Sequence, residues 1–351
     1  MALLIAVAVT TVLVAVSVEL HRRAYVAATV AAANRNRVTL NQMATSGIHA
    51  ALAILIKDKQ ASKFDSLQED WAQKEKIAAI LSAMGFDKGQ ISVKISDELS
   101  RIQVNALVVH PGGHLYLKSQ KIIWERLLDR LRLKLELEEE VQATAIMDAI
   151  KDWLDSGDDD AVSGLNGAES DFYQNLDPPY ACANGPIQHV SELALIKGIS
   201  SGLFNGTETA AGLKALVSIH GIEPDPAKRF AYKGRININT ADLPVLRVLL
   251  PPDRAEMATV MVDYRLAADA GAYINDLSQP TWYKNVVGLK DLDIDPALIT
   301  TQSDIYRIES TAHLRLFSQR IIAVVQRKDV FQNSQNQYKV LRWIVKYNIG
   351  D

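Results

Sequence analysis

The sequence predicts an α+β fold in which a long N-terminal helix leads into a sheet, and a large helical segment interrupts that sheet. Three observations predict it. A helical pattern without proline or glycine runs from the N-terminus to Ser46. The apolar and polar alternation of strands occurs at 90–109 and again after Thr300. The block between them is mainly helical, so the simplest interpretation is an insertion at 115–299.

Length and composition narrow the class of protein. The chain has 351 residues, enough for about two domains, and its 48% hydrophobic and 23% charged residues exclude a disordered chain. The balance of 38 Lys+Arg against 41 Asp+Glu gives a net charge of −3, which disfavours nucleic-acid binding through bulk charge. Cys182 is the only cysteine, so an intramolecular disulfide and a multi-cysteine metal site are excluded.

The first segment is apolar enough to cross a membrane. Residues 1–18 contain fifteen apolar residues, three hydroxyls and no charge, and a helix of about 20 residues spans a hydrocarbon core. A signal peptide would begin with basic residues, which are missing before this run, and a buried core helix is the other alternative. We interpret 1–23 as the transmembrane half of one helix that continues to about residue 57. Read alone, Arg22 and Arg23 would place the rest of the chain in the cytoplasm, so charge does not settle the topology.

The sheet is predicted from two separate regions. Ile91, Val93 and Ile95 alternate before the polar stretch 96–100, and Ile102 and Val104 follow it, which predicts a hairpin. Three more alternating stretches occur near the C-terminus, at 303–311, 319–327 and 337–347. We therefore assign the two parts of one sheet domain to 24–114 and 300–351.

An acidic loop is the clearest candidate for a metal site. The 45 residues of 152–196 contain no Lys or Arg. The same span contains nine carboxylates. They repel one another, so they must be solvated or neutralised. Oxygen ligands on a flexible loop suit Ca²⁺. Their spacing does not match an EF-hand, so a solvated loop and a calcium loop both stay open. The nine carboxylates are Asp152, Asp155, Asp158, Asp159, Asp160, Glu169, Asp171, Asp177 and Glu192.

The segment RININTA at 235–241 is similar to the start of helix-hairpin-helix modules in DNA-uptake and repair proteins. Asn239 or Thr240 is expected to cap the following helix. Such modules hold phosphate with backbone N–H groups of a glycine hairpin, but here the hairpin reads Leu-Pro-Pro-Asp at 250–253. Proline lacks an N–H and Asp253 repels phosphate, so no DNA-binding residues are assigned. The sequence also lacks the usual catalytic motifs, which favours a protein that is not an enzyme.

Four segments, in this order, resemble the type II secretion system protein K family, over nearly the whole chain. They are the opening MALLIAVAVTTVLVAV, the acidic stretch with DWLDSGDDD and GAESDFYQNLDPPYACANGPIQHVSELALIKGIS, the stretch RININTADLPVL, and the final strands SDIYRIESTAHL and YKVLRWI. The resemblance implies a pilin-like fold, with a long N-terminal helix on an antiparallel sheet and an all-helical insertion of the helix-hairpin-helix or SAM type.

The resemblance also implies a function. It is that of a minor pseudopilin, a structural protein at the tip of the periplasmic pseudopilus that helps initiate its assembly and protein export. Other minor pseudopilins would be its partners, and residues 1–20 would anchor it by a single pass in the bacterial inner membrane. No nucleic acid and no small-molecule substrate are expected. The alternatives are a membrane-anchored helix-hairpin-helix DNA-binding or uptake protein and a minor pilin of a related type IV pilus.

Individual residues follow from the same resemblance. Calcium is expected on Asp155, Asp158, Glu169 and Asp171. Met1 is expected to be the mature N-terminus, processed and methylated as in pilins. Ile5 stands where major pilins carry a glutamate that neutralises the N-terminus of a neighbouring subunit. A subunit without this carboxylate has no charge partner to offer in an apolar filament core, which favours a single copy at the tip.

Overall fold

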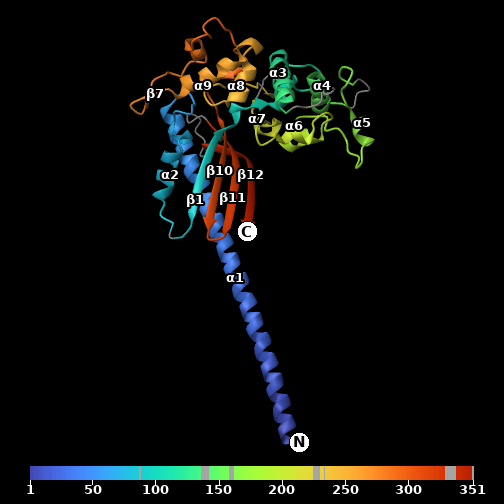
Figure 1. The fold of residues 1–351 in the computed structure, drawn as a ribbon, viewed down its shortest axis with the longest axis vertical. Coiled ribbons are helices and arrows are strands. Elements are labelled where there is room, and N and C mark those ends of the chain that lie inside the picture. The colour runs from blue at the N-terminus through green and yellow to red at the C-terminus, as the bar shows by residue number, and fades with distance from the viewer. Residues whose placement is uncertain are drawn as a thin grey trace.

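The computed structural model describes residues 1–86, 88–135, 142–157, 162–223, 230–232, 234–328 and 337–349. A long helix projects from the globular part, a four-stranded sheet packs on the end of this helix, and the inserted region lies at the end of the sheet farthest from the N-terminus (Figure 1). The last strand of the sheet ends near the point where the long helix leaves the sheet.

The long helix α1 (Ala2–Ala61) is continuous over 60 residues, as the sequence predicts. Its buried residues begin at Leu40, and the N-terminal half is exposed and apolar. By length and composition alone, α1 is able to cross a membrane. The helix is thus divided between an exposed apolar half and a half that packs on the sheet.

Gly47 marks the closest approach of α1 to the sheet. A Cβ atom at this position would lie 2.3 Å from Ser310 Oγ and 3.0 Å from Val93 Cγ2. The helix α1 continues through this glycine. Its missing side chain lets α1 contact the strands directly.

We expect Gly47→Val to lower the free energy of unfolding by about 1–3 kcal/mol, because the added methyl groups overpack the interface between helix and sheet. Urea denaturation of the full chain in detergent measures this loss. His49→Val is the matched control, since His49 is exposed on the same helix and also gains a β-branched side chain. Equal losses in the two variants would contradict the packing role of Gly47.

The main sheet is antiparallel, in the order β1-β10-β11-β12. Alternate side chains of the two central strands, such as Ile308 and Ile321, are buried in one cluster with the C-terminal part of α1. The three C-terminal strands confirm the prediction from alternation. The helix α2 (Lys74–Ser82) packs beside β1 at the edge of the sheet. The strands are β1 (Gln90–Asp97), β10 (Ile305–Leu314), β11 (Phe317–Arg327) and β12 (Tyr338–Ile349).

The predicted hairpin at 90–109 is wrong. The strand β1 pairs with β10, whereas β2 (Ile102–Gln103) pairs in parallel with β3 (Val217–Ser218). A short 3-10 turn follows β1 and redirects the chain. Alternation identifies a strand but not its partner, and here distant residues provide the partners of both strands.

The insertion has its own hydrophobic core, separate from that of the sheet and α1. The side chains of Ile102, Val104 and Leu107 belong to the insertion core, so the insertion starts just after Asp97 rather than at residue 115. Helices make up most of the regular structure of the insertion, but it also contains short strand pairs, which the sequence pattern does not indicate.

The helices of the insertion are α3 (Lys118–Lys134), α4 (Ala143–Leu154), α5 (Ser170–Gln174), α6 (Ser201–Asn205), α7 (Leu213–Leu216), α8 (Leu243–Leu249) and α9 (Ala258–Leu266). The other short strands are β4 (Ile222–Glu223), β5 (Ala231–Tyr232), β6 (Ile236–Asn237), β7 (Ala268–Asp269), β8 (Ala272–Tyr273) and β9 (Ile299–Thr300). The 3-10 helices of the chain are η1 (Asp70–Ala72), η2 (Glu98–Ser100), η3 (Val104–Leu107), η4 (Val190–Leu195), η5 (Pro252–Met257) and η6 (Trp282–Asn285).

Candidate functional site

Three carboxylates of the acidic loop converge in the insertion. Asp152 lies in the last turn of α4, Asp155 is the residue that ends this helix, and Glu169 precedes α5. One ligand oxygen from each of the three lies within 4.8 Å of the others, and all three residues are buried. The end of one helix and the start of another thus present three acids to one point.

Backbone N–H groups of the loop hold Asp152 in place. The Ser163 N–H donates to its two carboxylate oxygens at 3.1 and 3.2 Å, and the Ala168 N–H donates at 2.8 Å. A Cβ atom on Gly167 would lie 2.0 Å from Asp152 Oδ2, so only glycine allows the loop to come this close. Burial raises the pKa of Asp152, and the hydrogen bonds from Ser163 and Ala168 offset part of that rise.

Asp155 has a mixed environment. The Lys151 ammonium donates to its Oδ2 at 3.5 Å, so a cation just before the acidic stretch offsets part of its charge. His114 Nδ1 lies 3.9 Å from the same oxygen. The other oxygen, Oδ1, is buried and has no hydrogen-bond partner among the residues that the structure describes. Burial raises the pKa of Asp155.

This donor set fits a divalent cation such as calcium. Three buried carboxylates meet beside Lys151, and Asp155 Oδ1 is left to accept a ligand. Calcium prefers six to eight oxygen ligands, which carboxylates and backbone carbonyls supply. A bound ion would offset the cost of burying these carboxylates, which the raised pKa values of Asp152 and Asp155 reflect.

A second acidic group does not fit a metal. Asp58, Asp65 and Glu69 also lie close enough to share an ion. However, the Arg327 guanidinium donates to Asp58 Oδ2 at 3.0 Å and to Asp65 Oδ1. A protein cation therefore already occupies this position.

The predicted calcium ligands divide into three groups. Asp155 and Glu169 lie together, whereas Asp158 lies outside the described residues. Asp171 is exposed in the first turn of α5 and is not part of the group. Asp152, which was not among the expected ligands, takes part instead. Its spacing of three residues from Asp155 at a helix end is the signal that could have found it, because such residues share a face.

The RININTA segment joins the insertion to the sheet. Asn237 Nδ2 and Thr240 Oγ1 donate to Asp97 Oδ2, at 2.9 and 2.6 Å. Ser303 Oγ donates to the other oxygen of this buried carboxylate at 2.5 Å. Burial raises the pKa of Asp97 to about 6. The polar residues of the motif thus bind a carboxylate at the end of β1.

The expected helix cap at this motif is wrong. The residue before α8 is Asp242, without a side-chain cap hydrogen bond, whereas Thr240 donates to Asp97 and Asn239 Nδ2 donates to Leu277 O at 3.0 Å. The capping residues were misassigned because both types also form long-range hydrogen bonds. Arg247 before the hairpin pairs with Glu256 after it at 2.7 Å, and Asp253 in the hairpin is exposed.

The residues expected to act in assembly lie at the far end of α1. Met1 is 98% exposed and Ile5 is 63% exposed, and neither contacts the globular part. The exposed apolar half therefore depends on a membrane or on other protein chains for burial. The roles of Met1 and Ile5 themselves stay predictions.

Comparisons with known proteins agree on one family. Residues 100–209 match the family model described as "Type II secretion system (T2SS), protein K". The type II secretion system protein K of Aeromonas hydrophila is 27% identical over 185 residues, which cover 50% of this chain and 52% of that protein. The protein K of Pseudomonas aeruginosa is 32% identical over 176 residues, covering 48% and 44%. The chain thus spans about half the length of the curated relatives it matches.

A solved structure agrees with the fold. One chain in the crystal structure of the GspK-GspI-GspJ complex from the enterotoxigenic Escherichia coli type 2 secretion system superimposes with a TM-score of 0.58. The match has 20% sequence identity and covers 89% of this chain and 99% of that chain. Together with the long helix, the antiparallel sheet and the mainly helical insertion, it confirms the expected pilin-like α+β fold.

Proposed function

Because the chain belongs to the type II secretion system protein K family, we propose that it is a minor pseudopilin of such a system. Its task is structural: it helps to initiate the periplasmic pseudopilus and so supports protein export. The exposed apolar half of α1 anchors it in the bacterial inner membrane by a single pass, with the globular part in the periplasm. Other minor pseudopilins are its partners, which the complex that contains its structural relative supports.

The location of the insertion supports a position at the tip of the pseudopilus. Residues between Asp97 and Ile305 form a large body at the end of the sheet opposite the exposed half of α1 (Figure 1). In a filament, pilin-like subunits stack along their long helices, so this body would clash with a subunit placed above it. A single copy at the tip avoids the clash.

Imaging tests this position. A gold label on the insertion, viewed on sheared pseudopili by electron microscopy, should mark one end of each filament. A label spaced along the shaft would contradict the tip position, while leaving the family assignment unchanged.

The site supports calcium as a structural ion. Asp152, Asp155 and Glu169 would hold the ion, and its positive charge would offset the repulsion among these buried acids. When bound, the ion ties the end of α4 to the start of α5. Its binding energy is then part of the folding energy of the insertion.

The pH dependence of this effect follows from the raised pKa values. In chelator, Asp152 and Asp155 bind protons more tightly in the folded state than in the unfolded state. Their contribution to stability is therefore fully present below an ordinary aspartate pKa, about 4, and is lost as the pH rises through the folded-state pKa. Calcium requires both groups deprotonated.

We therefore expect the gain in melting temperature from calcium over chelator to shrink as the pH is lowered from about 8 to about 5. Differential scanning calorimetry in both conditions measures this gain, and the subtraction removes the effect of acids elsewhere in the chain. A gain that stays constant or grows on acidification would show that these carboxylates do not bind the ion.

The other function classes receive less support. Burial raises the pKa of the Cys182 thiol to about 12, so this group does not supply a thiolate nucleophile at neutral pH. The prolines of the hairpin lack the N–H groups that hold DNA phosphates, and the exposed Asp253 carboxylate repels phosphate. A structural protein that is not an enzyme and does not bind DNA is thus our proposal.

A further inference from the structure

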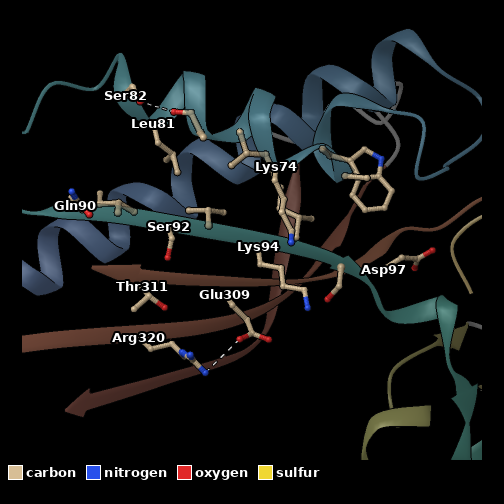
Figure 2. Close-up of a pocket in the computed structure, with 18 of the residues that line it drawn as sticks. Lys74, Leu81, Ser82, Gln90, Ser92, Lys94, Asp97, Glu309, Thr311 and Arg320 are labelled. Carbon is tan, nitrogen blue, oxygen red and sulfur yellow. Dashed lines mark hydrogen bonds and ion pairs between the residues drawn. The ribbon is translucent and has the colours of Figure 1, made fainter. Parts of the chain in front are cut away.

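A groove runs along the outer edge of β1, where α2 lies beside the strand (Figure 2). It encloses about 980 Å³. The strand β1 pairs with β10 on one side, and no described strand pairs with its other side. Unpaired N–H and C=O groups of an edge strand are able to accept a further strand. The groove is as large as the pockets that hold whole ligands.

One side of the groove is apolar. Ile77 and Leu81 of α2 line it together with Ile91 and Val93 of β1. The two β1 residues are only half-buried, so part of their apolar surface is exposed. An added strand would place every second side chain against this surface.

The other face of β1 carries Lys94, which forms no ion pair with any residue that the structure describes. Lys94 lies directly opposite Glu309 in the strand register, but Glu309 pairs with Arg320 of β11 at 3.8 Å. No ion pair among the described residues involves Lys94 or Lys74, and both line the groove (Figure 2). The charges on β11, β10 and β1 are therefore positive (Arg320), negative (Glu309) and positive (Lys94), in this order across the sheet. The position next to Lys94 on an added strand favours a carboxylate.

We propose that this groove binds an extended segment of a partner protein, which adds a strand to β1 and places a carboxylate beside Lys94. Apolar side chains alternate with this acid and pack on Ile91 and Val93 below α2. A bound helix would leave the edge groups of β1 without partners, whereas a strand bonds to them. The groove is separate from the exposed half of α1, so this interaction goes beyond the proposed function and does not depend on it.

Two labelled peptides test the proposal on the full chain in detergent micelles. Each has eight residues, the length of β1, with valine alternating with glutamate in one and with lysine in the other. Fluorescence anisotropy should show that the glutamate peptide binds more tightly by about tenfold, and that Lys94→Glu reverses this preference. Lys346→Glu, an exposed lysine on the opposite edge strand β12, is the matched control and should leave the preference unchanged.

Hydrogen exchange identifies the mode of binding. Addition of the glutamate peptide should slow the exchange of amides in residues 90–97, because the edge groups of β1 become hydrogen-bonded. The proposal is overturned if Lys94→Glu leaves the preference for the acidic peptide intact. It is equally overturned if protection appears on β12 instead of β1.

Discussion

Arg327→Met is expected to lower the free energy of unfolding by about 3–5 kcal/mol, because it leaves buried carboxylates without their cation. The Arg327 side chain is 1% exposed. It bonds to Asp58 and Asp65, which come from α1 and the segment after it, and donates to Ser303 O at 2.7 Å. It also lies over the Tyr306 ring, 4.5 Å from its centroid. One guanidinium thus joins the long helix to two strands.

Urea denaturation of the full chain in detergent measures this loss. Arg320→Met is the matched control, since Arg320 lies on the same strand with its side chain 52% exposed, and its loss should stay within about 0.5 kcal/mol. Adding Asp65→Asn to Arg327→Met should recover about 1–3 kcal/mol, because it removes one of the buried charges left without a cation. Similar losses at Arg327 and Arg320 would show that the buried ion pairs do not hold the helix on the sheet.

Removal of calcium should lower stability by an amount of the same order. At a free calcium concentration about a thousand times Kd, binding contributes about 4 kcal/mol, which corresponds to about 8–16 °C for a domain of this size. The effect should fall on the transition of the insertion, where Asp152, Asp155 and Glu169 meet. Calorimetry in calcium and in chelator measures the shift.

Two substitutions locate the ion. Glu169→Gln should remove most of the calcium-dependent shift, because it deletes one of the three converging charges. Asp171→Asn is the matched control: Asp171 lies two residues away but is exposed, so its loss should leave the shift unchanged. If both variants behave alike, or if the wild-type chain melts at the same temperature in calcium and chelator, the site is not at these residues.

The long helix and the C-terminal strands could be predicted from the sequence because their signals are local. The uninterrupted helical run of α1 and the alternation of β10, β11 and β12 depend only on neighbouring residues. The acidic character of residues 152–196 is local in the same sense, since it depends only on composition. The resemblance of four ordered segments to one family then predicted how the sheet and the insertion are combined.

The partners of the strands and the side chains that come together from distant segments could not be predicted in this way. The sequence pattern of β1 is the same whether it pairs with β2 or, as observed, with β10 more than two hundred residues later. Likewise, the role of Gly47 depends on Ser310, and the cation between Asp58 and Asp65 is an arginine from β11. These contacts are non-local, so their partners are determined by packing of the whole chain.

The sequence by itself determined that the chain has an apolar helix able to span a membrane, a sheet split by an insertion, and an acidic loop with the composition of a calcium site. Only the tertiary structure decided which acids converge, because burial at the junction of α4 and α5 selects Asp152 and leaves Asp171 in solvent. It also decided that RININTA binds Asp97 of the sheet, since a buried carboxylate requires donors and this segment supplies two of them.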